Sequence, residues 1–287
     1  MSVAGGLPFA VARAHMHQCE TLQIFTKNAS QWRARPLPPD EIAAFREAAE
    51  KTGIHPIVSH ASYLINLATM NPAVREQSIA ALGEEVDRAE ALGLLGVVLH
   101  PGARMNAPVD DAIHLIVDAL AQVLKARPKG TTMILLEHTA GQGSTMGSNF
   151  EEIAAMLDGG TATSRLGVCL DTCHLLASGY DLCSEEGYRS TFARFDELIG
   201  VDRLKVFHLN DSKKPCQSRV DRHEHIGKGC IGLEPFRRLV NDPRFAHLPM
   251  VIETEKTASR TQGKGLVKID PLDEMNLRTL RSLRSGA

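Results

Sequence analysis

The chain has 287 residues, of which 43% are hydrophobic and 23% are charged, and its formal net charge is −2 at neutral pH. These values are ordinary for a globular protein with a large core, and they exclude a protein that binds nucleic acid through a strongly basic global field. Any contact with DNA therefore has to come from a local basic surface.

The six cysteines form no dense framework, and a chain of this length needs no disulfides to stabilise its core. No segment is apolar enough to be read as a signal peptide or a membrane span. We therefore expect reduced thiols in a cytoplasmic protein that does not contact a membrane.

Seven short apolar runs recur along the chain, and each is continuously apolar rather than alternating. A continuous run of this kind is typical of a strand buried on both faces of a parallel sheet. The predicted strands are residues 22–25, 55–60, 96–100, 133–138, 167–171, 205–210 and 250–254.

Amphipathic helical patterns lie between and after these runs, several of them with clear start and stop residues. One begins at Asn71 and Pro72 and ends at Gly93, and another carries the capping-box pattern of Ser148 with Glu151 three residues later. The predicted helices are residues 39–53, 71–93, 110–130, 148–160, 188–200, 233–242 and 271–283.

This alternation predicts an α/β fold of parallel βαβ units, and specifically a (β/α)8 TIM barrel. Residues 1–287 show no linker or change of composition, so we expect a single domain. Only seven strands are visible, and only four residues precede Gly5, where a first strand is expected. We therefore expect a barrel that lacks its first strand at the N-terminus.

Six of the predicted strands end in a side chain that can bind a metal ion. One such residue alone is more often an ordinary core or capping residue. In a barrel, however, these ends converge on one face, and six acidic and imidazole groups there would be costly without cations. His with Asp or Glu is a ligand set for zinc or manganese. The six residues are His60, His100, Glu137, Asp171, His208 and Glu253.

A second group of possible ligands lies in loops. His174 follows Asp171 by three residues, and Asp221 and His223 are two residues apart, so an extended loop directs both to one side. His225 has the same parity and is an alternative ligand. Together with His174, this loop could hold a further ion.

Several segments of the chain resemble the signature segments of a known family, the endonuclease IV family of abasic-site endonucleases. The similarity extends over about residues 5–283. The segments are SHASYLINL, LHPG, EHTAGQGSTMG, GVCLDTCH, HLNDSK, SRVDRHEHIGKG and VIET.

The resemblance implies a TIM barrel that binds three zinc ions, with manganese as an alternative for some of them. It implies one ion at His60, His100 and Glu137, a second at Glu137, Asp171, His208 and Glu253, and a third at His174, Asp221 and His223. It therefore favours His223 over His225, and it marks Glu137 and Glu253 as catalytic.

The implied activity is hydrolysis of the phosphodiester bond 5′ to an abasic site, by a hydroxide activated by the zinc ions. The products are a 3′-hydroxyl and a 5′-deoxyribose phosphate, and cleaning of blocked 3′ ends is a further implied activity. The implied partner is double-stranded DNA that contains abasic sites, bound by a monomer.

Contacts with DNA are expected from three segments. The resemblance implies that Tyr63 and Leu64 form a wedge where the base is missing, whereas without it we would prefer ordinary packed loop residues. The basic segments supply candidate phosphate contacts. These candidates are Lys27, Asn28, Arg33 and Arg222.

The sequence departs from the family pattern at two further positions. Ser30 stands where the family has an arginine, so either Arg33 or Arg35 replaces it or the protein binds the abasic site more weakly. His138 stands where an asparagine is usual, and its side chain should point away from Glu137. The alternative function is a metal-dependent sugar isomerase or epimerase on the same barrel, which would need neither the loop ligands nor the wedge.

Overall fold

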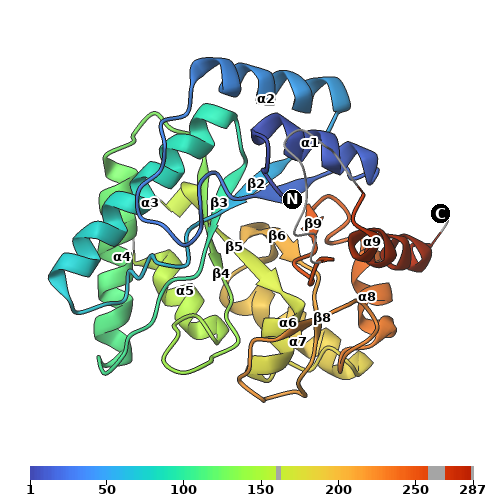
Figure 1. Ribbon diagram of the computed structural model, residues 1–287. Helices are drawn as coiled ribbons and strands as arrows, with labels where there is room; N and C mark the ends of the chain where they lie inside the picture. Colours follow the sequence, from blue (N-terminus) through green and yellow to red (C-terminus); the bar gives the residue numbers. More distant parts are fainter. Residues whose placement is uncertain (160–162, 258–268, 286–287) are drawn as a thin grey trace. The chain divides into compact units, whose positions relative to one another are not determined.

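The computed structural model describes residues 1–159, 163–257 and 269–285 (Figure 1). In these residues the chain forms two compact units. Among these residues, the first unit comprises 1–136, 155–159 and 163–167. The second comprises 137–154, 168–257 and 269–285. Each unit is built from parallel strands and the helices that connect them.

The first four strands pair in parallel and in chain order. Leu22 pairs with Ile57, Val58 with Gly96, and Gly96 in turn with Met133. All residues of the first three strands are buried, as expected for strands covered on both faces. The strands are β1 (Leu22–Ile24), β2 (Ile57–His60), β3 (Gly96–Leu99) and β4 (Met133–Glu137).

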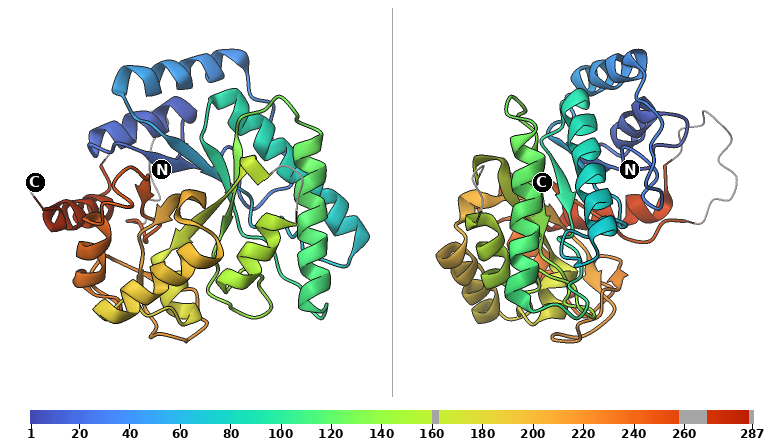
Figure 2. Two further views of the ribbon diagram at one scale, coloured as in Figure 1. Left: turned by 180° about the vertical axis from the view of Figure 1, so that it is seen from behind. Right: turned by 90° about the vertical axis from the view of Figure 1, so that its left-hand side faces the viewer.

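Four helices of the first unit pack one against the next, α1 on α2, α2 on α3 and α3 on α4 (Figures 1 and 2). The start of α3 is as predicted, since the side chain of Asn71 accepts hydrogen bonds from the backbone of Ala73 and Val74. The helices are α1 (Leu7–Met16), α2 (Pro39–Thr52), α3 (Pro72–Leu92) and α4 (Val109–Lys125).

The strands β5, β6 and β9 also pair in parallel and in chain order, with Asp171 opposite His208 and His208 opposite Val251. A short antiparallel pair, β7 and β8, places Ser212 opposite His223. These strands are β5 (Leu166–Asp171), β6 (Leu204–His208), β7 (Asp211–Ser212), β8 (His223–Glu224) and β9 (Met250–Val251).

The remaining helices connect or follow these strands, and α8 packs against α9. They are α5 (Phe150–Asp158), the 3-10 turn η1 (Thr163–Arg165), α6 (Thr172–Ser178), α7 (Glu185–Leu198), the 3-10 turn η2 (Val201–Arg203), α8 (Leu233–Val240) and α9 (Pro271–Leu283). All seven predicted strands and all seven predicted helices are present in the described residues. No strand precedes α1 there, as predicted.

The capping box of α5 lies one residue later than predicted. Asn149, not Ser148, accepts the hydrogen bond from the backbone of Glu152, at 2.8 Å. The carboxylate of Glu152 reaches back to Ser148 N at 3.3 Å and to Asn149 Nδ2 at 2.9 Å. Asn149 followed three residues later by Glu152 thus forms the reciprocal cap that the prediction assigned to Ser148 and Glu151.

Two helices were not predicted. The first, α1, begins at Leu7, after Gly6, which offers no side chain for capping, and has Pro8 in its first turn. The other, α6, is only seven residues long and is capped by Asp171, a residue that the sequence suggested as a metal ligand. Short helices without an apolar stripe are hard to recognise from periodicity.

Glu90, near the end of α3, anchors the segment that enters β4. Its carboxylate accepts hydrogen bonds from Thr131 N at 2.9 Å and Thr132 N at 2.8 Å. Burial alone would raise the pKa of Glu90, but these hydrogen bonds lower it from 4.5 to about 2. A depressed pKa contributes stability that is present above the unfolded pKa and is lost as the pH falls through the folded pKa.

We expect Glu90→Gln to lower the free energy of unfolding by about 1–2 kcal/mol at pH 7, after allowance for solvent screening. The difference from the wild type should shrink as the pH falls from 5 towards 2, because the wild-type carboxylate then becomes protonated. Urea unfolding across this pH range measures it, with the exposed Glu50→Gln as the control. A difference that stays constant with pH would contradict the assignment.

Candidate metal centre

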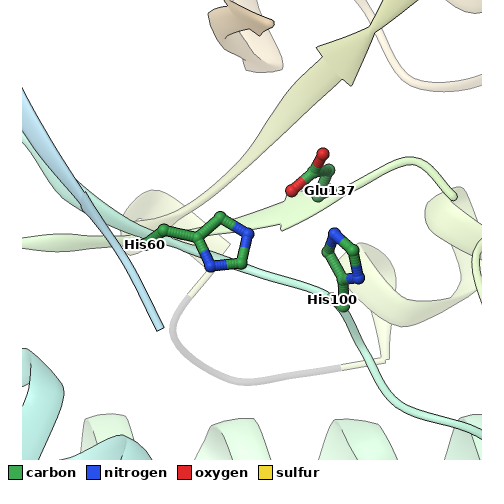
Figure 3. A group of neighbouring side chains, drawn as sticks. All are labelled: His60, His100 and Glu137. Atoms are coloured by element: carbon green, nitrogen blue, oxygen red, sulfur yellow. The ribbon is translucent and has the colours of Figure 1, made fainter. Parts of the chain in front are cut away.

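Three side chains meet at the ends of the adjacent strands β2, β3 and β4. His60 is the last residue of β2, His100 follows β3, and Glu137 is the last residue of β4. One ligand atom of each lies within 4.8 Å of the others. Figure 3 shows the two imidazoles and the carboxylate directed toward one another. The first predicted ligand set is therefore assembled by strand register alone.

The second predicted ligand set is also assembled. One ligand atom from each of Glu137, Asp171, His208 and Glu253 lies within 4.8 Å of the others. His208 Nδ1 lies 3.1 Å from Glu137 Oε1 and 3.2 Å from Glu253 Oε2. Glu137, Asp171 and His208 are fully buried. Glu137 belongs to both ligand sets, which is the position expected of a bridging ligand.

The third predicted group also comes together, although only Asp221 lies in a loop, whereas His174 belongs to α6 and His223 to β8. Asp221 lies between two imidazoles, with Oδ2 3.3 Å from His174 Nε2 and Oδ1 3.3 Å from His223 Nε2. His223 Nε2 is also 3.5 Å from Asp171 Oδ2. His225 is in no potential metal-binding group of the described residues. Its Nδ1 lies instead 3.0 Å from Asn276 Nδ2, so the structure favours His223 as the ligand.

The pKa values of these groups are shifted by their charged neighbours. Burial lowers the pKa of His174, but Asp171, Asp221 and Glu137 outweigh it and raise this pKa well above its usual value. The same balance, with Asp171 and Asp221 as the main carboxylates, raises the pKa of His223 to about 9. Burial would raise the pKa of Asp221, yet His174 and His223 lower it far below its usual range. Protons on the imidazoles take the place that divalent cations would fill.

Backbone carbonyls orient several of the imidazoles. His60 Nδ1 lies 2.7 Å from Ala61 O, His174 Nδ1 lies 2.8 Å from His138 O, and His223 Nδ1 lies 3.3 Å from Glu253 O. A hydrogen bond donated by Nδ1 directs Nε2 toward a metal ion. The buried Nε2 of His223 makes no hydrogen bond with any described residue. This donor set fits a hydrated zinc or manganese ion.

Asn210 is a supporting residue that the sequence analysis did not identify. Its Nδ2 donates to Asp171 Oδ2 at 2.6 Å, and its Oδ1 accepts from the backbone of Glu253 at 2.8 Å. The other oxygen of Asp171 caps α6 through Cys173 N at 2.6 Å. Asn210 follows β6, two residues after His208, so the strand-end rule used for the ligands could have found it.

His138 points away from Glu137, as predicted, and is fully buried. Its ring lies 5.5 Å from that of Phe150 and 5.4 Å from that of Tyr180. Burial lowers the pKa of His138 to about 3, so its imidazole is neutral.

Cys173 lies close to Asp221 and His223 and is a buried thiol. Burial raises the pKa of this thiol to about 12. A thiol with this pKa is an ordinary packed side chain rather than a ready metal ligand.

The predicted DNA contacts differ in accessibility. Tyr63 is 60% exposed and Leu64 is half-buried. Asn28 and Arg33 are both exposed. Arg222 is also accessible and donates to the carbonyl of the ligand Asp221 at 2.7 Å.

The prediction that Lys27 contacts a DNA phosphate is wrong. It is buried, and its Nζ lies 3.5 Å from Glu84 and 3.7 Å from Glu85, so it is not available to bind a phosphate. Arg35 is paired with Glu41 at 2.7 Å.

Comparisons with known proteins agree with this geometry. A family model described as a xylose isomerase-like TIM barrel matches residues 11–274. A protein named Probable endonuclease 4 from Chloroflexus aurantiacus is 48% identical over 100% of this chain and 97% of its own length. The equivalent protein from Geobacter sulfurreducens is 47% identical over 99% and 92%.

The crystal structure of endonuclease IV from Thermus thermophilus is 34% identical, with a TM-score of 0.83 over 99% of this chain and 96% of that one. The chain belongs to the endonuclease IV family. Its fold class is accordingly the α/β TIM barrel, as predicted. A D-tagatose 3-epimerase-like protein, at 18% identity and a TM-score of 0.67 over 93% and 89% of the two chains, shares the fold alone. No helix in the described part of this endonuclease IV family member is long and apolar enough to cross a membrane.

We expect Asn210→Ala to lower zinc affinity by about 10–100-fold, because residues that orient metal ligands typically contribute that much. A competition titration against a coloured chelator measures the affinity, and circular dichroism confirms that the variant is folded. The exposed Asn106→Ala serves as the control. Equal zinc affinity in the wild type and Asn210→Ala would show that Asn210 does not position the ligands.

Proposed function

We propose that this protein is a DNA-repair endonuclease that cleaves the phosphodiester bond 5′ to an abasic site and leaves a 3′-hydroxyl and a 5′-deoxyribose phosphate. The observation that carries the proposal is the set of ligand groups that share Glu137, in a chain of the endonuclease IV family. We also propose that the protein removes blocking groups from 3′ ends, because this reaction too is the hydrolysis of a phosphate ester.

The cofactor we propose is three zinc ions, with manganese able to replace some of them. His60, His100 and Glu137 would hold the first ion. Glu137, Asp171, His208 and Glu253 would hold the second, and His174, Asp221 and His223 the third. Bound zinc supplies Lewis acidity, which lowers the pKa of water to about 7 and offsets the charge of the phosphate.

The protein's own residues would supply position and shape. Glu137 and Glu253, the proposed catalytic residues, both contact His208, and the buried Glu137 can offer one oxygen to each of two ions. The burial of Glu137 and Asp171 strengthens the electrostatic attraction to cations. Asp221 and His223 are less buried than these two carboxylates, so the third ion would be accessible to a leaving group.

The partner we propose is double-stranded DNA with an abasic site, bound by a monomer in the cytoplasm through a single domain. The exposed ring of Tyr63 lies 5.1 Å from that of His60 and 6.0 Å from that of His100, so a wedge at this position would sit beside the first ligand set. Arg35 is paired with Glu41, whereas Arg33 makes no ion pair with a described residue. Arg33 is therefore the better candidate to replace the family arginine at the position of Ser30.

A sugar isomerase or epimerase is not favoured. The likeness to D-tagatose 3-epimerase-like protein extends to the fold alone. The convergence of His174, Asp221 and His223 adds a ligand set that such a reaction does not require. The exposed aromatic ring of Tyr63 next to the site also fits a large substrate better than a small sugar.

We expect the protein to cleave a duplex oligonucleotide at a single abasic site and to leave an undamaged duplex intact. Prolonged treatment with a chelator should abolish cleavage, and added zinc should restore it, because the carboxylates require the cations. Gel analysis with end labelling identifies the termini. Cleavage that leaves a 3′-aldehyde, or that survives full removal of metal, would contradict the proposal.

A further inference from the structure

Glu85 of α3 is a buried carboxylate beneath the loops that follow β1 and β2. It is only 1% exposed, and burial raises its pKa. Thr26, Lys27, the backbone of Ser62 and Arg88 oppose this effect through hydrogen bonds and charge. A carboxylate so deeply buried is costly unless it is fully compensated, and its partners here come from two different loops.

The loop formed by residues 26–35 is held at its start by this carboxylate. Thr26 Oγ1 donates to Glu85 Oε2 at 2.8 Å, and Lys27 Nζ lies 3.7 Å from Glu85 Oε1. The same Lys27 donates to the carbonyl of Trp32 at 3.1 Å. Lys27 thus links the buried carboxylate to the far part of the loop.

Arg88, one turn further along α3, closes the same loop. Its Nε donates to Thr26 Oγ1 at 3.1 Å, and its Nη2 donates to the carbonyl of Thr26. Its Nη1 donates to the carbonyl of Arg35 at 2.9 Å. Arg88 therefore holds both ends of the loop, and it binds the same Thr26 that donates to Glu85.

The segment after β2 is joined to the same network through Ser62. The backbone of Ser62 donates to Glu85, and its hydroxyl donates to the carbonyl of Ala29 at 2.6 Å. That hydroxyl also accepts from Leu64 N at 3.3 Å. The backbone on both sides of Tyr63 is therefore connected to the loop 26–35.

We propose that Glu85 is a positioning residue that holds the loop 26–35 and the segment 62–64 in one arrangement for binding DNA with an abasic site. The proposal rests on the proposed function. Buried ion networks contribute little to stability when compared with apolar packing, so the network is better explained by the geometry it enforces. A contact surface that is already ordered loses less conformational freedom on binding.

The test compares Glu85→Gln with Glu84→Gln. Glu84 is the adjacent residue and lies 3.5 Å from Lys27 Nζ, but its side chain is 40% exposed. It makes no hydrogen bond to Thr26 or Ser62 among the described contacts. We expect Glu85→Gln to raise KM for an abasic duplex about tenfold, which corresponds to about 1.4 kcal/mol, while kcat changes less than about twofold. Glu84→Gln should resemble the wild type.

Hydrogen exchange provides a second readout that does not depend on catalysis. In Glu85→Gln, the backbone amides of residues 26–35 and 62–64 should exchange faster together, while zinc content stays at the wild-type level. If Glu85→Gln does not fold, Ser62→Ala replaces it. This variant removes the hydroxyl that joins Ala29 to Leu64, so it should raise KM and accelerate exchange in both segments.

The proposal is overturned if a folded Glu85→Gln, or Ser62→Ala in its place, has wild-type KM and wild-type exchange. It is also overturned if kcat and zinc content fall while KM does not rise. A wild-type protein that does not cleave or bind the abasic duplex would sink the proposed function. The exchange experiment would then still decide whether Glu85 couples the two segments.

Discussion

The structure depends on one electrostatic constraint, which is that buried carboxylates and imidazoles lie close together, where cations or protons must balance the negative charge. Glu137 and Asp171 are fully buried, and Glu253 lies within 3.2 Å of the same imidazole that contacts Glu137. Without a metal ion, the neighbouring imidazoles bind protons more tightly and take over this charge. A metal ion bound here would therefore release protons, which would link metal binding to pH.

The scaffold meets this constraint with its backbone. The imidazole of His60 is oriented by the carbonyl of the next residue, Ala61. The imidazole of His174 is oriented by the carbonyl of His138, and that of His223 by the carbonyl of Glu253. Asn210 joins Asp171 to the backbone of Glu253. A ligand's orientation is thus set largely by the main chain at the strand ends, and strand register controls much of the geometry.

The strands were predictable because burial on both faces leaves a continuous apolar run in the sequence. The candidate ligands were predictable because each is a polar residue at the end of such a run, as Asp171 is in β5. The third ligand set was harder, since spacing alone left His223 and His225 equivalent and only the family resemblance favoured His223. The contact of His225 with Asn276 agrees with that choice. Lys27 was assigned to DNA on charge alone. The sequence predicts a helix over residues 71–93, but it does not show that Glu84 and Glu85 of this helix lie beside Lys27. Asn210 was within reach of the strand-end pattern, because it follows His208 by two residues. Glu85 acts through contacts distant in sequence, which no local pattern reveals.

The central proposal is that Glu137 would be a ligand of two metal ions. X-ray diffraction from zinc-loaded crystals, recorded on both sides of the zinc absorption edge, tests it most directly. The account predicts anomalous peaks on both sides of the Glu137 carboxylate and a third beside Asp221. Zinc found elsewhere, or a Glu137 carboxylate that contacts no ion, would contradict it.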